Sequence, residues 1–145
     1  MRRSLVLLSL LAAVSALGAC GPGSKAGGGS DALAANSWRA VEVSGKPVPA
    51  SLEVTLSFAD GRVSGNSGCN NYGGDATATG ESLRVSAIMS TKMACLEAGV
   101  METEMAYLQA LRGAERWAVG SDGHLVISGA KGEIRLTPVA AGKQP

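Results

Sequence analysis

The order of hydrophobic and polar positions predicts a chain made mostly of short β-strands. Several segments alternate, wholly or in part, with a period of two, as strands with one buried face do. These segments are residues 38–43, 53–58, 83–87, 124–128 and 133–138. In the first of them Val41 and Val43 share a face, but Trp38 falls on the opposite one. We therefore expect a β-bulge there, or a strand that is covered on both sides.

Turn residues separate these segments. Asp60-Gly61 and Asp122-Gly123 are Asp-Gly pairs between alternating runs, a strong signal for a β-hairpin. They predict one hairpin over residues 53–65 and a three-stranded meander over residues 115–136.

One segment, residues 100–113, has a helical period instead. Its apolar stripe consists of Met101, Met105, Leu108 and Leu111. We assign Glu102 and Glu104 to the solvated side of the first turns, where carboxylates favour a helix start, and Gly113 to the stop. The stripe is expected to pack on the sheet.

Together these elements predict a mainly β fold with one inserted α-helix. We expect an antiparallel, partly open β-barrel of about eight short strands packed on the amphipathic helix, because a barrel leaves few free sheet edges. A β-sandwich is the alternative.

The N-terminal sequence predicts export. Residues 1–19 combine a basic start, an apolar run and small residues before Cys20, as in a signal peptide. An uncleaved anchor helix is the alternative, but the run is short for a membrane span. Leu17-Gly18-Ala19-Cys20 resembles the lipobox of bacterial lipoproteins, which implies a diacylglycerol on Cys20. Gly21 follows instead of the aspartate typical of inner-membrane retention, so in a cell with two membranes an outer-membrane anchor facing the periplasm is expected.

Glycine and serine dominate the next stretch, so residues 20–35 are assigned to a lipidated N-terminus and flexible tether. Residues 36–139 then form one domain, and residues 140–145 a tail. The formal net charge of the 145 residues is +1, and no basic patch or charge block is present. This balance argues against nucleic acid as a partner and makes the lipid, not charge, the means of membrane attachment.

Two cysteines remain once Cys20 is acylated. In an oxidising compartment Cys69 and Cys95 are read first as a disulfide, with a buried reduced pair as the alternative. His124 is the only histidine, too few for a zinc site, and its place in a predicted turn makes it a poor catalytic base. We therefore expect no metal, no cofactor and no catalytic residue.

Three ordered motifs carry a family resemblance. They are "VSGNSGCNNYGG", "STKMAC" and "ETEMAYLQAL", which contain Gly68-Cys69-Asn70, Thr91 to Cys95, and Glu104 with Tyr107. Residues 36–139 thereby resemble the META domain of heat-inducible HslJ-type envelope lipoproteins. The resemblance implies a barrel-like β fold with a helix and a broad link to stress tolerance. It implies no enzymatic activity.

The resulting functional hypothesis is a lipid-anchored, non-catalytic envelope protein. It would serve stress tolerance or envelope maintenance by binding another envelope protein. The alternative is a carrier of a lipid or small apolar ligand inside the barrel, with Met93, Met101 and Met105 lining the cavity. A packed interior favours protein binding, and a void favours the carrier.

Overall fold

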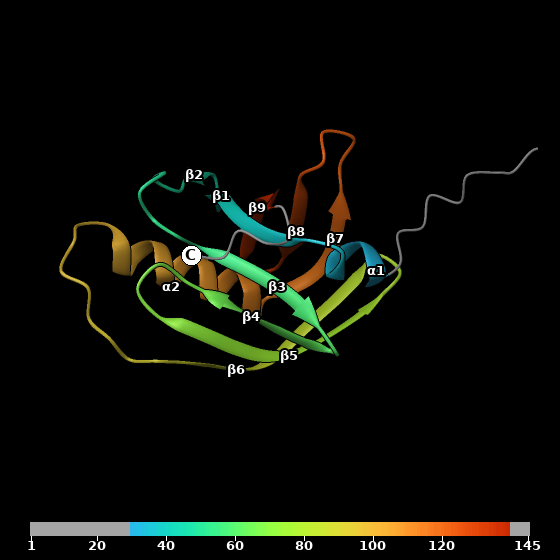
Figure 1. The fold of residues 1–145 in the computed structure, drawn as a ribbon, viewed down its shortest axis with the longest axis horizontal. Coiled ribbons are helices and arrows are strands. Elements are labelled where there is room, and N and C mark those ends of the chain that lie inside the picture. Colours follow the sequence, from blue (N-terminus) through green and yellow to red (C-terminus); the bar gives the residue numbers. More distant parts are fainter. Residues whose placement is uncertain (1–29, 140–145) are drawn as a thin grey trace, which may run out of the picture.

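A computed structural model describes residues 30–139 of the chain (Figure 1). Most of this range consists of strands and helices that are connected by short turns. The elements are α1 (Ser30–Ala34), β1 (Ser37–Val43), β2 (Lys46–Pro47), β3 (Thr55–Ala59), β4 (Arg62–Asn66), β5 (Asn71–Thr79), β6 (Ser82–Ser90), α2 (Val100–Arg112), β7 (Ala114–Val119), β8 (Leu125–Gly129) and β9 (Gly132–Val139). The predicted signal peptide, Cys20, most of the predicted tether and the predicted tail lie outside the described residues.

All strands belong to one antiparallel sheet with the order β2-β1-β3-β4-β5-β6-β7-β8-β9. A further pairing between β1 and β9 closes this sheet into a barrel of eight strands, to which β2 adds a short extra ribbon on β1. The mainly β fold with one long helix is therefore confirmed, but the barrel is closed and not partly open. Its shortest strand pairing lies between β6 and β7, where Ser82 and Arg116 are the only residues in register.

The predicted hairpins are present. Between β3 and β4, Asp60 and Gly61 have φ angles of 51° and 73°, and two consecutive positive values are what a two-residue type I′ hairpin turn requires. Strands β7, β8 and β9 form the expected meander.

Strand β1 contains the expected bulge. Its register against β9 shifts between Ala40 and Glu42. Because the shift moves later side chains to the other face, Trp38 and Val43 both point inward and are 1% and 3% exposed.

The last residues of the predicted tether are structured. Residues 30–34 form α1, and Leu33 is fully buried in the core. The indole Nε1–H of Trp38 donates a hydrogen bond of 3.0 Å to the Leu33 carbonyl oxygen, which ties this turn to β1. The assignment of residues 30–35 to a flexible segment is therefore wrong, because a buried leucine and a tryptophan bond anchor it to the barrel.

Helix α2 packs against β1, β6, β8 and β9 (Figure 1). It begins after Gly99, which has a φ of 84°, and ends before Gly113. Its buried residues are Val100, Glu104, Tyr107, Leu108, Ala110 and Leu111. The predicted stripe is thus partly wrong: Met105 faces solvent and Glu104 faces the core.

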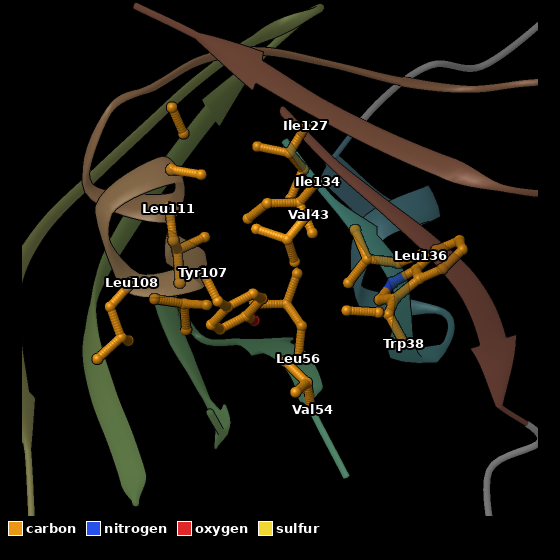
Figure 2. Close-up of a cluster of buried hydrophobic side chains, with 14 of the residues drawn as sticks. Trp38, Val43, Val54, Leu56, Tyr107, Leu108, Leu111, Ile127, Ile134 and Leu136 are labelled. Carbon is orange, nitrogen blue, oxygen red and sulfur yellow. The ribbon is translucent and has the colours of Figure 1, made fainter. Parts of the chain in front are cut away.

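Side chains fill the space between helix and barrel. Figure 2 shows Tyr107 and Leu111 of α2 pointing toward side chains from the strands, among them Leu56 and Ile134. The largest fully buried side chains are Trp38, Tyr107, Leu33, Leu56, Leu83, Leu111, Leu125, Ile127, Ile134, Leu136, Val54 and Val63. The described residues contain no helix long and apolar enough to cross a membrane.

Candidate functional site

The two internal cysteines are joined. Cys69 follows β4 and Cys95 lies in the loop between β6 and α2, and a disulfide connects them with 5.9 Å between their Cα atoms. This confirms the predicted pair. The two cysteines are 26 positions apart in the sequence. Closing a loop of that length stabilises the folded state by about 3.5 kcal/mol if the effect is the lost entropy of the unfolded chain. The bond fastens together residues 66–70 and 91–95, which with Glu104 we call the motif corner.

A buried carboxylate lies at the centre of the motif corner. Glu104 is 5% exposed although it is charged. Its Oε2 accepts hydrogen bonds from the backbone N–H groups of Cys69 (3.2 Å) and Asn70 (2.8 Å) and lies 2.8 Å from the Ser67 hydroxyl. Its Oε1 accepts a bond of 2.7 Å from the Asn70 side chain. Four donors from one loop thus replace the water that Glu104 loses on burial.

Asn70 connects this carboxylate to the third segment of the corner. Its Nδ2 also donates to the Met93 carbonyl oxygen at 3.1 Å. Its Oδ1 accepts from the Thr91 hydroxyl and from the Met93 backbone N–H, both at 2.7 Å. These partners fix the amide in one orientation, with Nδ2 toward Glu104.

The loop backbone fits this arrangement. Asn66 accepts a hydrogen bond of 2.7 Å from the Gly68 N–H through its side chain, as in an Asx turn. Gly68 has a φ of 116°, which a residue with a side chain rarely adopts. Residues 67–70, between β4 and β5, therefore form a constrained backbone turn.

Two effects oppose each other in the pKa of Glu104. Burial alone would raise it, because burial penalises the charged form. The hydrogen bonds from Ser67, Asn70 and Cys69 outweigh burial and lower the pKa below its ordinary value. The assignment of Glu104 to a solvated helix face is wrong, since its carboxylate is buried and hydrogen-bonded to the loop of residues 67–70.

A tyrosine pair extends the corner into the core. The hydroxyl oxygens of Tyr72 and Tyr107 lie 2.6 Å apart, and that of Tyr72 lies 2.9 Å from the Thr55 carbonyl oxygen. Their rings meet edge to face with centroids 5.7 Å apart. Burial raises the pKa of both phenols, and for Tyr72 the neighbouring Tyr107 adds to the shift. Both hydroxyls are thus neutral structural groups.

The only histidine lies away from this corner, in the turn between β7 and β8. Its Nδ1 is 3.3 Å from Asp122, which also pairs with Arg135. The backbone N–H of His124 lowers the pKa of Asp122, and the nearby Arg135 guanidinium and His124 side chain lower it further. Among residues 30–139, no group of three or more His, Cys, Asp or Glu residues is placed to hold a metal ion.

The three methionines proposed to line a cavity do not share one. Met93 is 60% exposed and Met105 62% exposed, so both project from the surface, whereas Met101 is half-buried against the core. The expectation that Met93 and Met105 line the barrel interior is wrong, because Tyr107, Leu108 and Leu111 occupy the inward face of α2.

Two grooves on the surface are open to solvent. The first, of about 470 Å³, lies between α1, the β3–β4 hairpin and β5. The second, of about 430 Å³, borders the motif corner between residues 51–53 and residues 95–100.

The fold and the corner define a class: a closed antiparallel barrel with one packed helix and a disulfide-fixed, carboxylate-centred loop. The family profile of the META domain matches residues 31–141, and the chain belongs to this family. No curated protein that was compared matches the chain.

Solved structures share the fold. An NMR structure of a protein from Burkholderia xenovorans is 23% identical, with a TM-score of 0.64, over 77% of this chain and 88% of that one. A second NMR structure is 20% identical, with a TM-score of 0.64, over 75% and 93%. The crystal structure of a DUF4847 family protein from Bacteroides vulgatus ATCC 8482 is 17% identical, with a TM-score of 0.52, over 80% and 99%. At these identities the similarity concerns the fold alone.

Proposed function

We propose that this META domain protein is a lipid-anchored, non-catalytic envelope protein that supports the envelope by binding another protein. The observation that carries the proposal is the contrast between a filled interior and an apolar exterior near α2. Met89, Met93, Leu96 and Met105 are 78%, 60%, 99% and 62% exposed. We call these four residues the exposed apolar residues.

Exposed apolar side chains that gather into a patch often mark a contact site for a partner, and methionine adapts to partners of different shape. Two of the four, Met93 and Leu96, lie in the segment between β6 and α2, next to the disulfide, and Met89 lies near the end of β6. The segment is thus held in place on one side while its side chains remain accessible. Such preorganisation reduces the entropy lost on binding.

The anchor rests on the sequence. Acylation of Cys20 would hold the barrel near a membrane, with an outer-membrane position facing the periplasm as the expected location. Palmitate labelling that is lost in Cys20→Ala, together with membrane attachment, would support it. Attachment that persists in Cys20→Ala would contradict it.

In-cell photocrosslinking tests the binding role. A photoreactive amino acid at Leu96 should crosslink the full chain to a discrete envelope protein, whereas the same group at Ala118, exposed on β7, should not. The triple variant Met89→Ser, Met93→Ser and Met105→Ser should weaken the Leu96 crosslink. Absence of a discrete product from every surface position would contradict the proposal.

The carrier role has less support. The barrel interior is occupied by side chains that are less than 2% exposed, and both described grooves open outward. A native mass spectrum of the full chain distinguishes the roles, because a bound apolar molecule would add mass that is lost on unfolding.

A further inference from the structure

The groove beside the motif corner combines an apolar base with acidic edges. Leu52 and Val100 line its base and are 8% and 7% exposed. Glu53 and Glu97 line it from opposite segments, and both are exposed. Within residues 30–139 neither carboxylate takes part in an ion pair, unlike Asp75 and Asp122.

The two sides of the groove are held by separate devices. On the side of residues 95–97, the disulfide fixes Cys95, which itself lines the groove. On the side of residues 51–53, the Arg39 guanidinium donates hydrogen bonds to the carbonyl oxygens of Ala50 and Leu52, at 2.5 and 3.3 Å. The groove therefore does not need to form when a ligand arrives, which favours binding.

Its size and chemistry restrict the ligand. A volume of about 430 Å³ is within the usual range for a binding pocket and accommodates a few side chains. Leu96, 99% exposed at the edge, offers further apolar contact. Two unpaired carboxylates would repel an acidic ligand and attract a basic one.

We propose that this groove binds a short segment of a partner protein in which an apolar side chain lies beside lysine or arginine. The apolar side chain contacts Leu52, Val100 and Leu96, and the cations pair with Glu53 and Glu97. The inference rests on the proposed protein-binding function and adds the site and the chemistry of the partner.

The test is an NMR titration of the full chain, purified from the envelope in detergent, with a synthetic peptide that carries leucine between lysines. We expect shifts in the amide signals of Glu53, Leu96, Glu97 and Val100, and weaker binding at higher salt. A peptide with glutamate in place of lysine, and one with serine in place of leucine, should bind more weakly.

A matched pair of variants assigns the effect to the groove. Glu53→Gln with Glu97→Gln should weaken binding by at least about threefold, as the loss of two exposed ion pairs implies. Glu115→Gln with Glu133→Gln changes the net charge equally on exposed residues that do not line the groove, and it should leave binding unchanged. All four positions are exposed, so both variants should fold.

Several results would overturn the inference. The first is that the lysine peptide shifts no amide signals, or only signals from other surfaces. The second is that both variant pairs weaken binding equally. The third is that concentrating the protein alone shifts the signals of the groove residues, which would identify a second copy as the occupant. The protein-binding function would survive these results if crosslinking from Leu96 still captured an envelope protein. Loss of both would reject the function as well as the groove.

Discussion

Glu104→Gln tests whether the buried carboxylate holds the motif corner together. In the native protein both carboxylate oxygens accept hydrogen bonds, three donors reaching Oε2 and the Asn70 amide reaching Oε1. Glutamine has one acceptor and one donor in the same shape. If its oxygen takes the place of Oε2, its NH₂ group faces the NH₂ group of Asn70. Asn70 cannot turn over without losing its bonds to Thr91 and Met93.

These contacts set the expected magnitude. A hydrogen bond to a charged group contributes about 1.5–3 kcal/mol, and an unsatisfied buried donor costs a similar amount. We expect Glu104→Gln to lower the free energy of unfolding by about 2–3 kcal/mol. Glu104→Ala leaves every donor without its partner, so its expected cost is about 3–5 kcal/mol. Either loss is large for a small domain, whose total stability is typically about 5–15 kcal/mol.

The assay is equilibrium unfolding in urea with the disulfide intact. Glu102→Gln is the matched control, because it removes the same charge from an exposed position of the same helix turn and should change stability by less than about 0.5 kcal/mol. A Glu104→Gln variant as stable as this control would refute the assigned role. The carboxylate would then be a tolerated buried charge and not the group that holds residues 66–70.

Three further measurements follow from the structure. Cys69→Ser and Cys95→Ser should each cost about 2–4 kcal/mol in urea, and the double variant no more than either, because all remove one bond; additive losses would contradict this. Because the pKa of Glu104 is lowered by folding, its contribution is complete above the unfolded-state pKa of about 4.3 and is lost as the pH falls through the folded-state pKa. Wild type should therefore lose more stability on acidification than Glu104→Gln, and parallel pH profiles would exclude the effect. Gly65→Ala should cost roughly 3 kcal/mol, because the added methyl group would clash with the Thr55 carbonyl oxygen. Urea unfolding measures this loss. Gly73→Ala is the control, because its added Cβ atom would lie 3.7 Å from the nearest atom, the Val63 carbonyl oxygen.

Most of the strands were predictable because their signals are local, but β2 and β5 were not predicted. Alternation of apolar residues places β3 and β9, and the Asp-Gly pairs place the turns that follow β3 and β7. The closure of the barrel was not predictable, because it depends on pairing between β1 and β9 at opposite ends of the domain. No local pattern distinguishes a strand that meets such a partner from a free edge.

The helix shows a different limit. Counting only apolar residues placed Met105 inward and Glu104 outward, whereas the structure has the reverse. A signal was present, because Val100, Glu104, Tyr107 and Leu111 recur at steps of four, three and four and so share one face. A single glutamate within an otherwise apolar stripe indicates a buried hydrogen-bond acceptor, provided that another part of the chain supplies a loop with free backbone N–H groups. The sequence cannot show that residues 66–70 are that loop.

Most side chains of the motifs that identify the family make contacts within the domain itself. Cys69 and Cys95 are bonded to each other, Asn70 and Glu104 satisfy one another, and Tyr107 is buried against Tyr72. These side chains have few free groups with which to contact a partner. A sequence that matches the motifs is therefore expected to form the barrel and its motif corner, but the match does not identify a ligand. In the proposed function, recognition of a partner would come from side chains that the corner positions but does not use. Leu96 and Glu97 are of this kind, since they follow the bonded cysteine directly and yet remain exposed.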